Sequence, residues 1–404
     1  MKPLRLVLVT RRFWPLIGGG EKVMGNLGVE LASRGCRVTI LTARWRPTWP
    51  ARITFHEVPV VRLPPPDGRG WRTICYMRAL ARWLTRNQDA YDLVYVSGLK
   101  HEAYATLRTV GQRVPAALRA EKAGRHGDCL WQIEAGCGRR IKQRCMKAAA
   151  FVGPSRAVHR ELQAAGYPRP RIQLLHDGVA IPPPRSPKIK AAARAVLGEA
   201  NAALDVPHWA PLALYAGPMD AGKGLKHLLA AWGQIVARWP QARLWLAGDG
   251  PDRAALQAQI EAMNLGHRIA LVGVFDTVDE LLSAADLFVL PSLEGDFCLG
   301  LLEAMAAGLP IVAGDTPGNR DVLNDGREGL LVPAADAGAL SAAIARLFEQ
   351  RELASRLGAA ARDRAAAEFS LAQMADAHVT LFERLTADLR VLSPRPACGE
   401  RGRG

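Results

Sequence analysis

Short apolar runs alternate with longer amphipathic segments along most of this chain. The first run, LRLVLVT at residues 4–10, is nearly continuous, which is typical of a strand buried on both faces of a parallel sheet. A glycine-rich loop, a segment of helical periodicity and a second apolar run, CRVTILTA, follow it. Gly35 stands where such a helix would end. This order predicts a strand–helix–strand unit.

The same alternation recurs in two series. YDLVYVSG and AAAFVG continue the first series, which ends in the proline cluster IPPPRSP. A second series contains APLALYAG, ARLWLAGDG, IALVGVF, DLFVLPS and LPIVAGD. Alternating strands and helices predict an α/β fold, here two Rossmann-like, doubly wound parallel-sheet domains that face a cleft. We expect an N-terminal domain at 1–185, a linker at 186–205, a C-terminal domain at 206–370, a helix at 371–390 that returns to the N-terminal domain, and a disordered tail at 391–404.

Composition places the chain among ordinary globular proteins. Its 404 residues are 49% hydrophobic, and no run approaches the roughly 20 apolar residues that span a bilayer. The basic and then apolar start resembles a signal peptide, but arginines follow it and no cleavage site does, so a first strand is the better interpretation. The cysteines Cys129, Cys137 and Cys145 recur every eight residues, whereas metal sites favour closer pairs. We expect reduced thiols, a cytoplasmic location and no metal.

Charge is distributed unevenly. Residues 1–190 hold 34 Lys and Arg but 12 Asp and Glu, whereas the remainder is acidic. Such a basic half suits an anionic partner, and no nucleic-acid motif accompanies it, so an anionic membrane surface or a phosphorylated substrate is favoured. A compositional bias toward arginine is the alternative. The Trp- and Arg-rich stretch RWRPTWPAR, at 44–52, would lie in a membrane interface or form a packed loop.

Two glutamates flank a predicted helix start in PSLEGDFCLGLLEAMAAGLPIVAG, residues 291–314. Glu294 falls in the loop after a buried strand, and Glu303 falls in the first turns of the helix. Free amides around Phe297, Cys298 and Leu299 offer a phosphate site at the helix N-terminus. A carboxylate nearby accepts two hydrogen bonds from adjacent hydroxyls, as a ribose presents. In the alternative interpretation, Glu303 only stabilises the first turns of the helix, where acids are favourable, and Glu294 is a solvated loop residue.

Several stretches together resemble the GT-B glycosyltransferases of retaining family 4. They include GGGEKVMGNLGVELASRG, YAGPMDAGKGLKHLLAAW, LSAADLFVLPS, FCLGLLEAMAAGLPIVA and GNRDVLNDGREGLLV, in family order. The resemblance implies a retaining, metal-independent transfer of a hexose from a UDP- or GDP-sugar to an envelope glycan or lipid-linked acceptor. It implies no cofactor besides this donor.

The resemblance also assigns roles to residues. Glu303 matches the glutamate that holds the ribose, and Lys223 matches the lysine that neutralises the diphosphate, although a solvated lysine is the alternative. Glu294 or Asp296 would contact the transferred sugar. The full set of donor-binding candidates is Gly18, Gly19, Gly20, Glu121, His126, Gly217, Lys223, Phe297, Cys298, Leu299 and Glu303.

The chain departs from the family pattern in three places. Glu294 lies one residue too far from Glu303, which puts Gly295 in the usual place of the first glutamate. Pro218 stands where the family usually has an arginine, a loss that Lys226 or an arginine of the other domain would have to offset. Glu121 stands where the family usually has histidine, and His126 follows it as an alternative contact.

Two rival functions remain open on the sequence. One is a degenerate protein that binds sugar nucleotides without catalysis. The other is a different GT-B enzyme, such as a sugar-nucleotide epimerase or a phosphorylase. The stretch GLLEAMAAGLPIVA favours the transferase.

Overall fold

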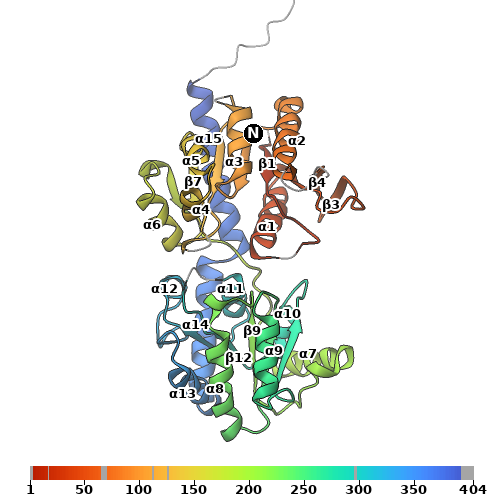
Figure 1. Ribbon diagram of the computed structural model, residues 1–404, viewed down its shortest axis with the longest axis vertical. Helices are drawn as coiled ribbons and strands as arrows, with labels where there is room; N and C mark the ends of the chain where they lie inside the picture. Colours follow the sequence, from red (N-terminus) through yellow and green to blue (C-terminus); the bar gives the residue numbers. More distant parts are fainter. Residues whose placement is uncertain are drawn as a thin grey trace, which may run out of the picture. The chain divides into compact units, whose positions relative to one another are not determined.

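The computed structural model describes residues 3–16, 18–64, 71–111, 113–124, 127–294 and 298–392, the last four without their side chains. These residues form two compact units, each with its own sheet and hydrophobic core (Figure 1). Unit 1 takes in the described residues of Met1–Pro154, Val158–Leu175 and Met374–Gly404. Unit 2 takes in those of Ser155–Ala157 and His176–Gln373.

Unit 1 is built on a sheet that has, among the described residues, eight strands in the order β3-β4-β2-β1-β5-β6-β7-β8. Neighbours pair in parallel, except that the edge strand β3 runs antiparallel to β4. The central strands are buried along their length, which is why they are apolar up to a single polar residue at the carboxyl end of β5 and β6. The strands are β1 (Arg5–Val9), β2 (Arg37–Ala43), β3 (Arg52–Phe55), β4 (Val58–Leu63), β5 (Leu93–Ser97), β6 (Ala116–Arg119), β7 (Ala150–Gly153) and β8 (Ile172–Leu174).

Helices connect these strands because parallel neighbours need a crossover. They are α1 (Gly19–Ser33), α2 (Arg72–Arg86), α3 (His101–Val110), α4 (Asp128–Glu134), α5 (Gly138–Cys145) and α6 (Arg156–Ala164), with short 3₁₀ turns at Gln88–Ala90 and Arg169–Arg171. The C-terminal helix α15 (Leu371–Leu392) joins unit 1 from Met374 onward (Figure 1). Its buried His378 Nε2 lies 3.0 Å from the hydroxyl of Tyr95 on β5.

Unit 2 has, among the described residues, a six-stranded parallel sheet in the order β11-β10-β9-β12-β13-β14. Its strands are β9 (Leu212–Ala216), β10 (Arg243–Ala247), β11 (Ile269–Gly273), β12 (Leu287–Leu290), β13 (Ile311–Gly314) and β14 (Leu330–Val332). Its helices are α7 (Pro187–Ala200), α8 (Leu225–Arg238), α9 (Arg253–Ala262), α10 (Asp279–Ala284), α11 (Leu299–Ala306), α12 (Pro317–Val322), α13 (Ala337–Glu349) and α14 (Arg351–Glu368), with 3₁₀ turns at Ala202–Leu204 and Ala221–Lys223. The predicted α/β class with two parallel-sheet domains is confirmed.

Each sheet reverses its direction of growth once. In unit 1 the chain adds β2 on one side of β1 and later places β5 on the other side. In unit 2 it adds β10 beside β9 and later places β12 on the opposite side. Connections diverge at such a point and leave a crevice beyond the carboxyl ends of the two strands, where ligands of open α/β sheets bind. The topology therefore predicts one crevice at β1/β5 and one at β9/β12.

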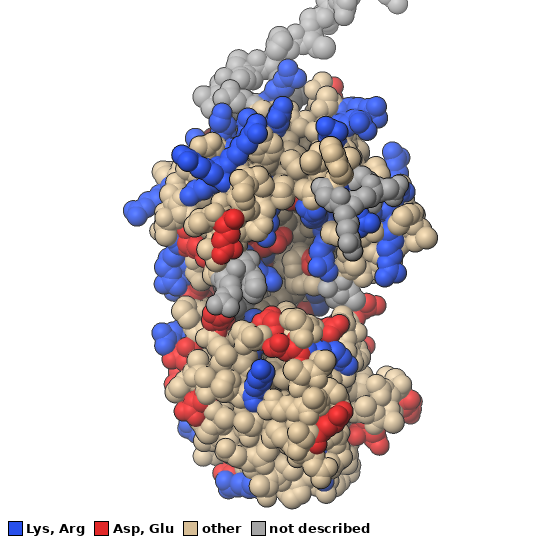
Figure 2. Space-filling view, in the orientation of Figure 1, with Lys and Arg blue, Asp and Glu red and all other residues tan. Residues whose placement is uncertain are grey.

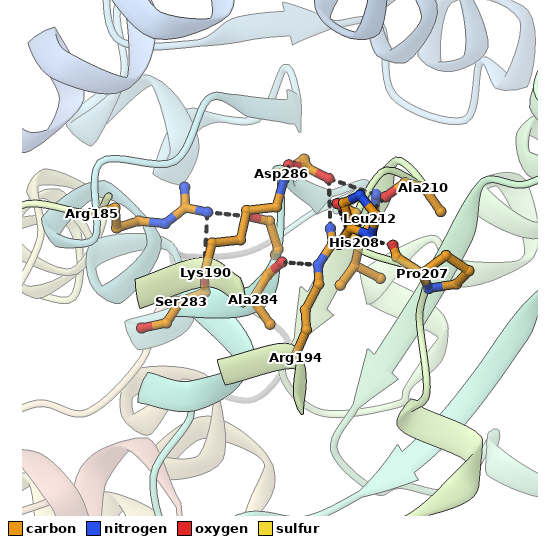
Figure 3. Close-up of polar contacts among 11 residues, drawn as sticks. Arg185, Lys190, Arg194, Pro207, His208, Ala210, Leu212, Ser283, Ala284 and Asp286 are labelled. Atoms are coloured by element: carbon orange, nitrogen blue, oxygen red, sulfur yellow. Dashed lines mark hydrogen bonds and ion pairs between the residues drawn. The ribbon is translucent and has the colours of Figure 1, made fainter. Parts of the chain in front are cut away.

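The segment predicted as a linker, 186–205, is instead an anchored part of unit 2. Ser186 caps helix α7, with its hydroxyl accepting from the Ile189 amide at 3.2 Å, and Pro187 occupies the first turn. Arg194, 4% exposed, donates to the carbonyls of Ala284, Pro207, His208 and Ala210 and to the Asp286 carboxylate (Figure 3). Lys190 also pairs with Asp286. The prolines before this helix suggested a linker, and the sequence alone did not show that Arg194 fixes the helix to unit 2.

The unit boundary and the end of the C-terminal helix both differ from the predicted positions. The division between the units falls near Leu175 and His176 rather than at residue 185. Helix α15 continues to Leu392, and the rest of the predicted tail lies outside the described residues. Within the described residues, no helix combines the length and the apolar character that crossing a membrane requires.

Candidate donor and acceptor sites

The loop after β9 carries the predicted lysine. Gly217 and Pro218 leave the strand, Asp220 accepts a hydrogen bond from the Gly222 amide at 3.1 Å, and a 3₁₀ turn ends at Lys223. Gly224 then takes a left-handed conformation with φ of 66° and starts helix α8. A Cβ on Gly224 would stand 2.1 Å from the carbonyl oxygen of Pro291, so this position needs glycine for its backbone angle and for its packing.

The loop after β12 packs directly against the lysine loop. The Leu293 amide donates to the Gly222 carbonyl at 2.9 Å, and a Cβ on Gly222 would stand 3.5 Å from Glu294 Oε1. Glu294 is therefore exposed beside the turn that holds Lys223. The structure brings together these two predicted residues, which come from different strands of the β9/β12 crevice.

Helix α11 begins at the same edge. It starts at Leu299, with Cys298 as its N-cap residue, and ends before Gly308, as predicted. A Cβ on Gly300 would stand 2.6 Å from the carbonyl oxygen of Ala216, the last residue of β9, so the helix N-terminus lies against the end of that strand. The half-buried Glu303 stands on the same helix, one turn further along.

Both Lys223, the predicted cation, and Glu303, the predicted carboxylate, affect the pKa of the Cys298 thiol. Burial raises its pKa, the Lys223 ammonium and the amides of Leu301 and Gly300 oppose the rise, and the Glu303 carboxylate adds to it. Charges act this way only from close range. Lys223 and Glu303 therefore both lie near Cys298, at the carboxyl edge of the unit 2 sheet where α11 begins.

Some predicted residues lie outside the described residues. They are Asp296, Phe297 and His126, together with Gly295. The choice between Glu294 and Asp296 as the first acid therefore remains a prediction.

In unit 1 the predicted glycines stand at the start of helix α1. Gly18 is its N-cap residue, and Gly19 and Gly20 form its first turn. A Cβ on Gly18 would stand 2.3 Å from Glu21 Oε2, and Glu21 pairs with Arg12 at 3.1 Å. The Glu21 carboxylate thus already lies at this helix end, so an anion approaching Gly18 would meet a paired acid.

Glu121 faces the glycine turn from the end of β6. A Cβ on Gly20 would stand 3.9 Å from Glu121 Oε1, and the Ser97 hydroxyl donates to the same oxygen at 2.7 Å. The Glu121 amide donates to Asp128 Oδ2 at 2.7 Å, and the Leu99 amide donates to Asp128 Oδ1 at 3.3 Å. The buried Asp128 carboxylate therefore ties together the loops that follow β5 and β6.

The Asp128 carboxylate holds its proton to a higher pH than an ordinary aspartate does. Burial and the nearby Glu121 raise the pKa of Asp128 to about 6, whereas Lys100, 3.8 Å away, opposes the rise. A second buried acid, Glu102, pairs with Arg11 at 3.3 Å, and burial raises its pKa as well. Glu121 is the exposed carboxylate of this group.

Sequence reasoning named Glu121 but missed its supporting residues. Ser97 ends β5, Lys100 follows three residues later, and Arg11 follows β1 by two residues. A polar residue that directly follows a buried apolar run could have indicated these site residues. The carboxyl ends of parallel strands lie at one edge of the sheet, so such residues gather there. Asp128 gave no such signal, because it stands seven residues after Glu121, at the start of helix α4 rather than directly after a strand.

Comparison with known proteins identifies the family. Residues 17–181 match the sequence profile described as Glycosyltransferase Family 4, and residues 199–364 match Glycosyl transferases group 1. The two matched ranges correspond closely to units 1 and 2.

Individual relatives are more distant. The chain is 29% identical over 177 residues to alpha-D-kanosaminyltransferase of Streptomyces kanamyceticus, an alignment that covers 43% of this chain and 46% of that protein. It is 31% identical over 182 residues to the lipopolysaccharide core biosynthesis glycosyltransferase LpsE of Rhizobium meliloti, covering 45% and 52%. These alignments span about half the length of each relative. N-acetyl-alpha-D-glucosaminyl L-malate synthase of Bacillus anthracis aligns over 93% of this chain and 96% of its own length at 22% identity.

Solved structures share the fold at low identity. Sucrose-phosphate synthase from Thermosynechococcus elongatus superposes with a TM-score of 0.78 at 23% identity, covering 95% of this chain and all of that one. Anabaena Alr3699/HepE in complex with UDP-glucose superposes with a TM-score of 0.76 at 19% identity, covering 94% of this chain and 100% of that one. With both units matched and this fold in place, the chain belongs to the group 1 glycosyltransferases of family 4, which have the GT-B fold.

Proposed function

We propose that the protein is a retaining, metal-independent glycosyltransferase that moves a hexose from a UDP- or GDP-sugar to an envelope glycan or lipid-linked acceptor. The observation that carries the proposal is the arrangement in unit 2. Lys223 and Glu303, in the segments that follow β9 and β12, both act on the Cys298 thiol at the start of α11. The Anabaena protein, which shares the fold, is described with bound UDP-glucose, which supports a nucleotide-sugar donor.

In this proposal the positive groups of the site contact the diphosphate of the donor, and the carboxylates contact its sugars. The Lys223 ammonium and the positive end of helix α11 would neutralise the negative charge that grows on the leaving diphosphate. Glu303, as a carboxylate, would accept hydrogen bonds from the two ribose hydroxyls. Glu294, exposed beside Gly222, would face the transferred sugar and stabilise positive character at its anomeric carbon.

A basic surface on unit 1 supports contact with an anionic membrane. Figure 2 shows Lys and Arg gathered over the unit 1 part of this face, with fewer over unit 2. Helices α2, α3 and α5 pack in sequence, and their one acid among the described residues, Glu102, is buried. A hydrogen bond from Arg108 and the charges of Arg140 and Arg144 lower the pKa of Tyr104. The exposed arginines of this surface are Arg72, Arg78, Arg82, Arg86, Arg108, Arg139 and Arg140.

Incubation with UDP- and GDP-sugars, followed by measurement of released nucleotide, tests the proposal. Nucleotide release that depends on an added glycan or lipid-linked acceptor is the expected result. Binding without release would favour the degenerate binding protein, and interconversion of free sugar nucleotides would favour the epimerase.

A further inference from the structure

Two exposed tryptophans lie at the carboxyl edge of the unit 1 sheet. Trp14, in the loop after β1, is 48% exposed, and Trp45, in the loop after β2, is 37% exposed. Each indole therefore offers apolar ring surface that a ligand could cover. We call Trp14 and Trp45, with the loops that hold them, the tryptophan shelf.

The buried Arg62 and the half-buried Arg11 hold the shelf in place. Arg62 is 3% exposed, and its guanidinium lies over the rings of Trp14, 6.0 Å from the ring centre, and Trp49, at 5.2 Å. It also donates to the carbonyl oxygen of Trp14 at 2.8 Å. The Trp45 indole N–H donates to the carbonyl oxygen of Arg11 at 3.0 Å, and the Arg11 guanidinium lies 5.9 Å from that ring. The shelf is therefore ordered before any ligand arrives.

The position of the shelf relates it to the reaction. Trp14 is four residues from Gly18, so the two Cα atoms are at most about 14 Å apart along the chain. Arg11, which holds Trp45, pairs with Glu102 at the edge of the β1/β5 crevice. The shelf thus adjoins the part of unit 1 where Gly20 and Glu121 stand.

A pyranose ring matches this surface chemically. One face of the ring carries C–H groups that pack on an indole, and its rim carries hydroxyls that need hydrogen-bond partners. Rigid aromatic rings provide contact area at little entropic cost, because few torsions have to be ordered on binding. Beside the shelf, the exposed Arg12 and its partner Glu21 supply a donor and an acceptor for hydroxyls.

We infer that the tryptophan shelf binds a pyranose unit of the acceptor, so that the acceptor is an oligosaccharide or glycoconjugate with at least one sugar ring beyond the reacting hydroxyl. The inference rests on the proposed function, since it identifies the acceptor class of the same reaction. It also places Trp45 in a sugar-binding surface rather than in a membrane interface.

A glycan array of neutral and acidic pyranose oligosaccharides, probed with the labelled full-length protein, tests the inference. Wild type is expected to label a related group of glycans, and Trp45→Ala and Trp14→Ala are expected to lose at least about tenfold of that signal. Trp45→Phe, which keeps a ring but loses the hydrogen bond to Arg11, should retain part of it. Trp209→Ala removes a tryptophan that is 59% exposed in unit 2 and should bind as wild type does.

Two further measurements make each outcome decisive. Unfolding midpoints of the variants, and their nucleotide binding at unit 2, show whether the protein remains folded and the donor site intact. Failure to bind any nucleotide would count against the proposed function while leaving a glycan result valid. No labelled glycan, equal labelling by Trp45→Ala, or a loss of binding by Trp45→Ala that is confined to anionic lipid vesicles would overturn the inference.

Discussion

Lys223 and Glu303, on different loops of unit 2, change the pKa of the same thiol in opposite directions. The ammonium of Lys223 favours the Cys298 thiolate, whereas the carboxylate of Glu303 disfavours it. The two side chains come from the segments that follow β9 and β12, the strands at the crevice. Cys298 therefore reports on both proposed donor contacts.

This relationship predicts the reactivity of Cys298 in the absence of any substrate. Burial raises the pKa of the thiol, so iodoacetamide should modify Cys298 more slowly than the exposed Cys137. Lys223→Ala should raise the pKa further and slow the reaction a few-fold. Glu303→Gln should lower the pKa and speed it up. Mass spectrometry of the modified peptides measures each rate, and identical rates in both variants and wild type would show that neither group lies near the thiol.

Asp128 should make the stability of unit 1 depend on pH. Its pKa is about 6 in the folded protein and 3.8 ordinarily, so the folded state keeps a proton in this interval that the unfolded chain releases. The free energy of unfolding therefore falls as the pH rises from about 4 to about 6, by up to about 3 kcal/mol from this group. Neighbouring groups that share the environment are Glu121, Lys100, Cys129, Cys145 and Tyr167.

Comparison with Asp128→Asn isolates this contribution. Both Asp128 oxygens accept backbone amides, so an asparagine must turn its NH₂ toward one of them and should weaken the protein at every pH. Urea unfolding between pH 4 and pH 8 gives the difference between wild type and variant. That difference should shrink between pH 4 and pH 6 and stay constant above about pH 7, and a difference independent of pH would refute the assignment.

Arg194 should stabilise unit 2 more than any exposed cation of helix α7. Its removal in Arg194→Met takes hydrogen bonds from four carbonyls and from Asp286, which keeps Lys190 and the Leu212 amide, at a cost of about 3 kcal/mol. Lys188→Met, at an exposed position of the same helix, should change stability by less than about 0.5 kcal/mol. Denaturant midpoints of the two variants check this, and equal effects would contradict the anchoring role.

The basic surface of unit 1 should bind anionic vesicles in a salt-dependent way. Each basic residue near such a surface contributes about 1 kcal/mol, so replacing Arg78, Arg82 and Arg86 together with glutamate should weaken binding at least about a hundredfold. Sedimentation with phosphatidylserine vesicles at increasing salt measures the effect. Trp45→Ala should leave it unchanged, and an equally strong loss in that variant would move the contact to the tryptophan shelf.

Much of the fold could be predicted from local sequence. Continuous apolar runs marked the parallel strands, and glycines such as Gly35 and Gly308 ended the helices with positive φ of 84° and 70°. The order of strands within each sheet could not be predicted, because it depends on which crossovers pack together. That order creates the β1/β5 and β9/β12 crevices.

The sequence named the candidate residues of unit 2 and only some of those in unit 1, and their roles stay predictions. Lys223 and Glu303 belong to stretches that resemble the family, and the structure shows them acting on one thiol. Gly224, by contrast, is explained only by the carbonyl of Pro291 packed against it. Asp128 and Ser97 were missed because their contacts with Glu121 join segments whose proximity the tertiary structure alone establishes.

Nucleotide binding tests the central claim most directly. Titration calorimetry of UDP, GDP and ADP with the full chain should show that one diphosphate binds. Lys223→Ala and Glu303→Ala should each weaken it by about tenfold to a hundredfold, as the loss of a charge-assisted contact predicts. Lys226→Ala shows whether that neighbouring ammonium replaces the arginine absent at Pro218, and Lys188→Ala serves as the unaffected control. Well-folded protein that binds none of the three nucleotides, or that binds one equally well without Glu303 and Lys223, would contradict the account.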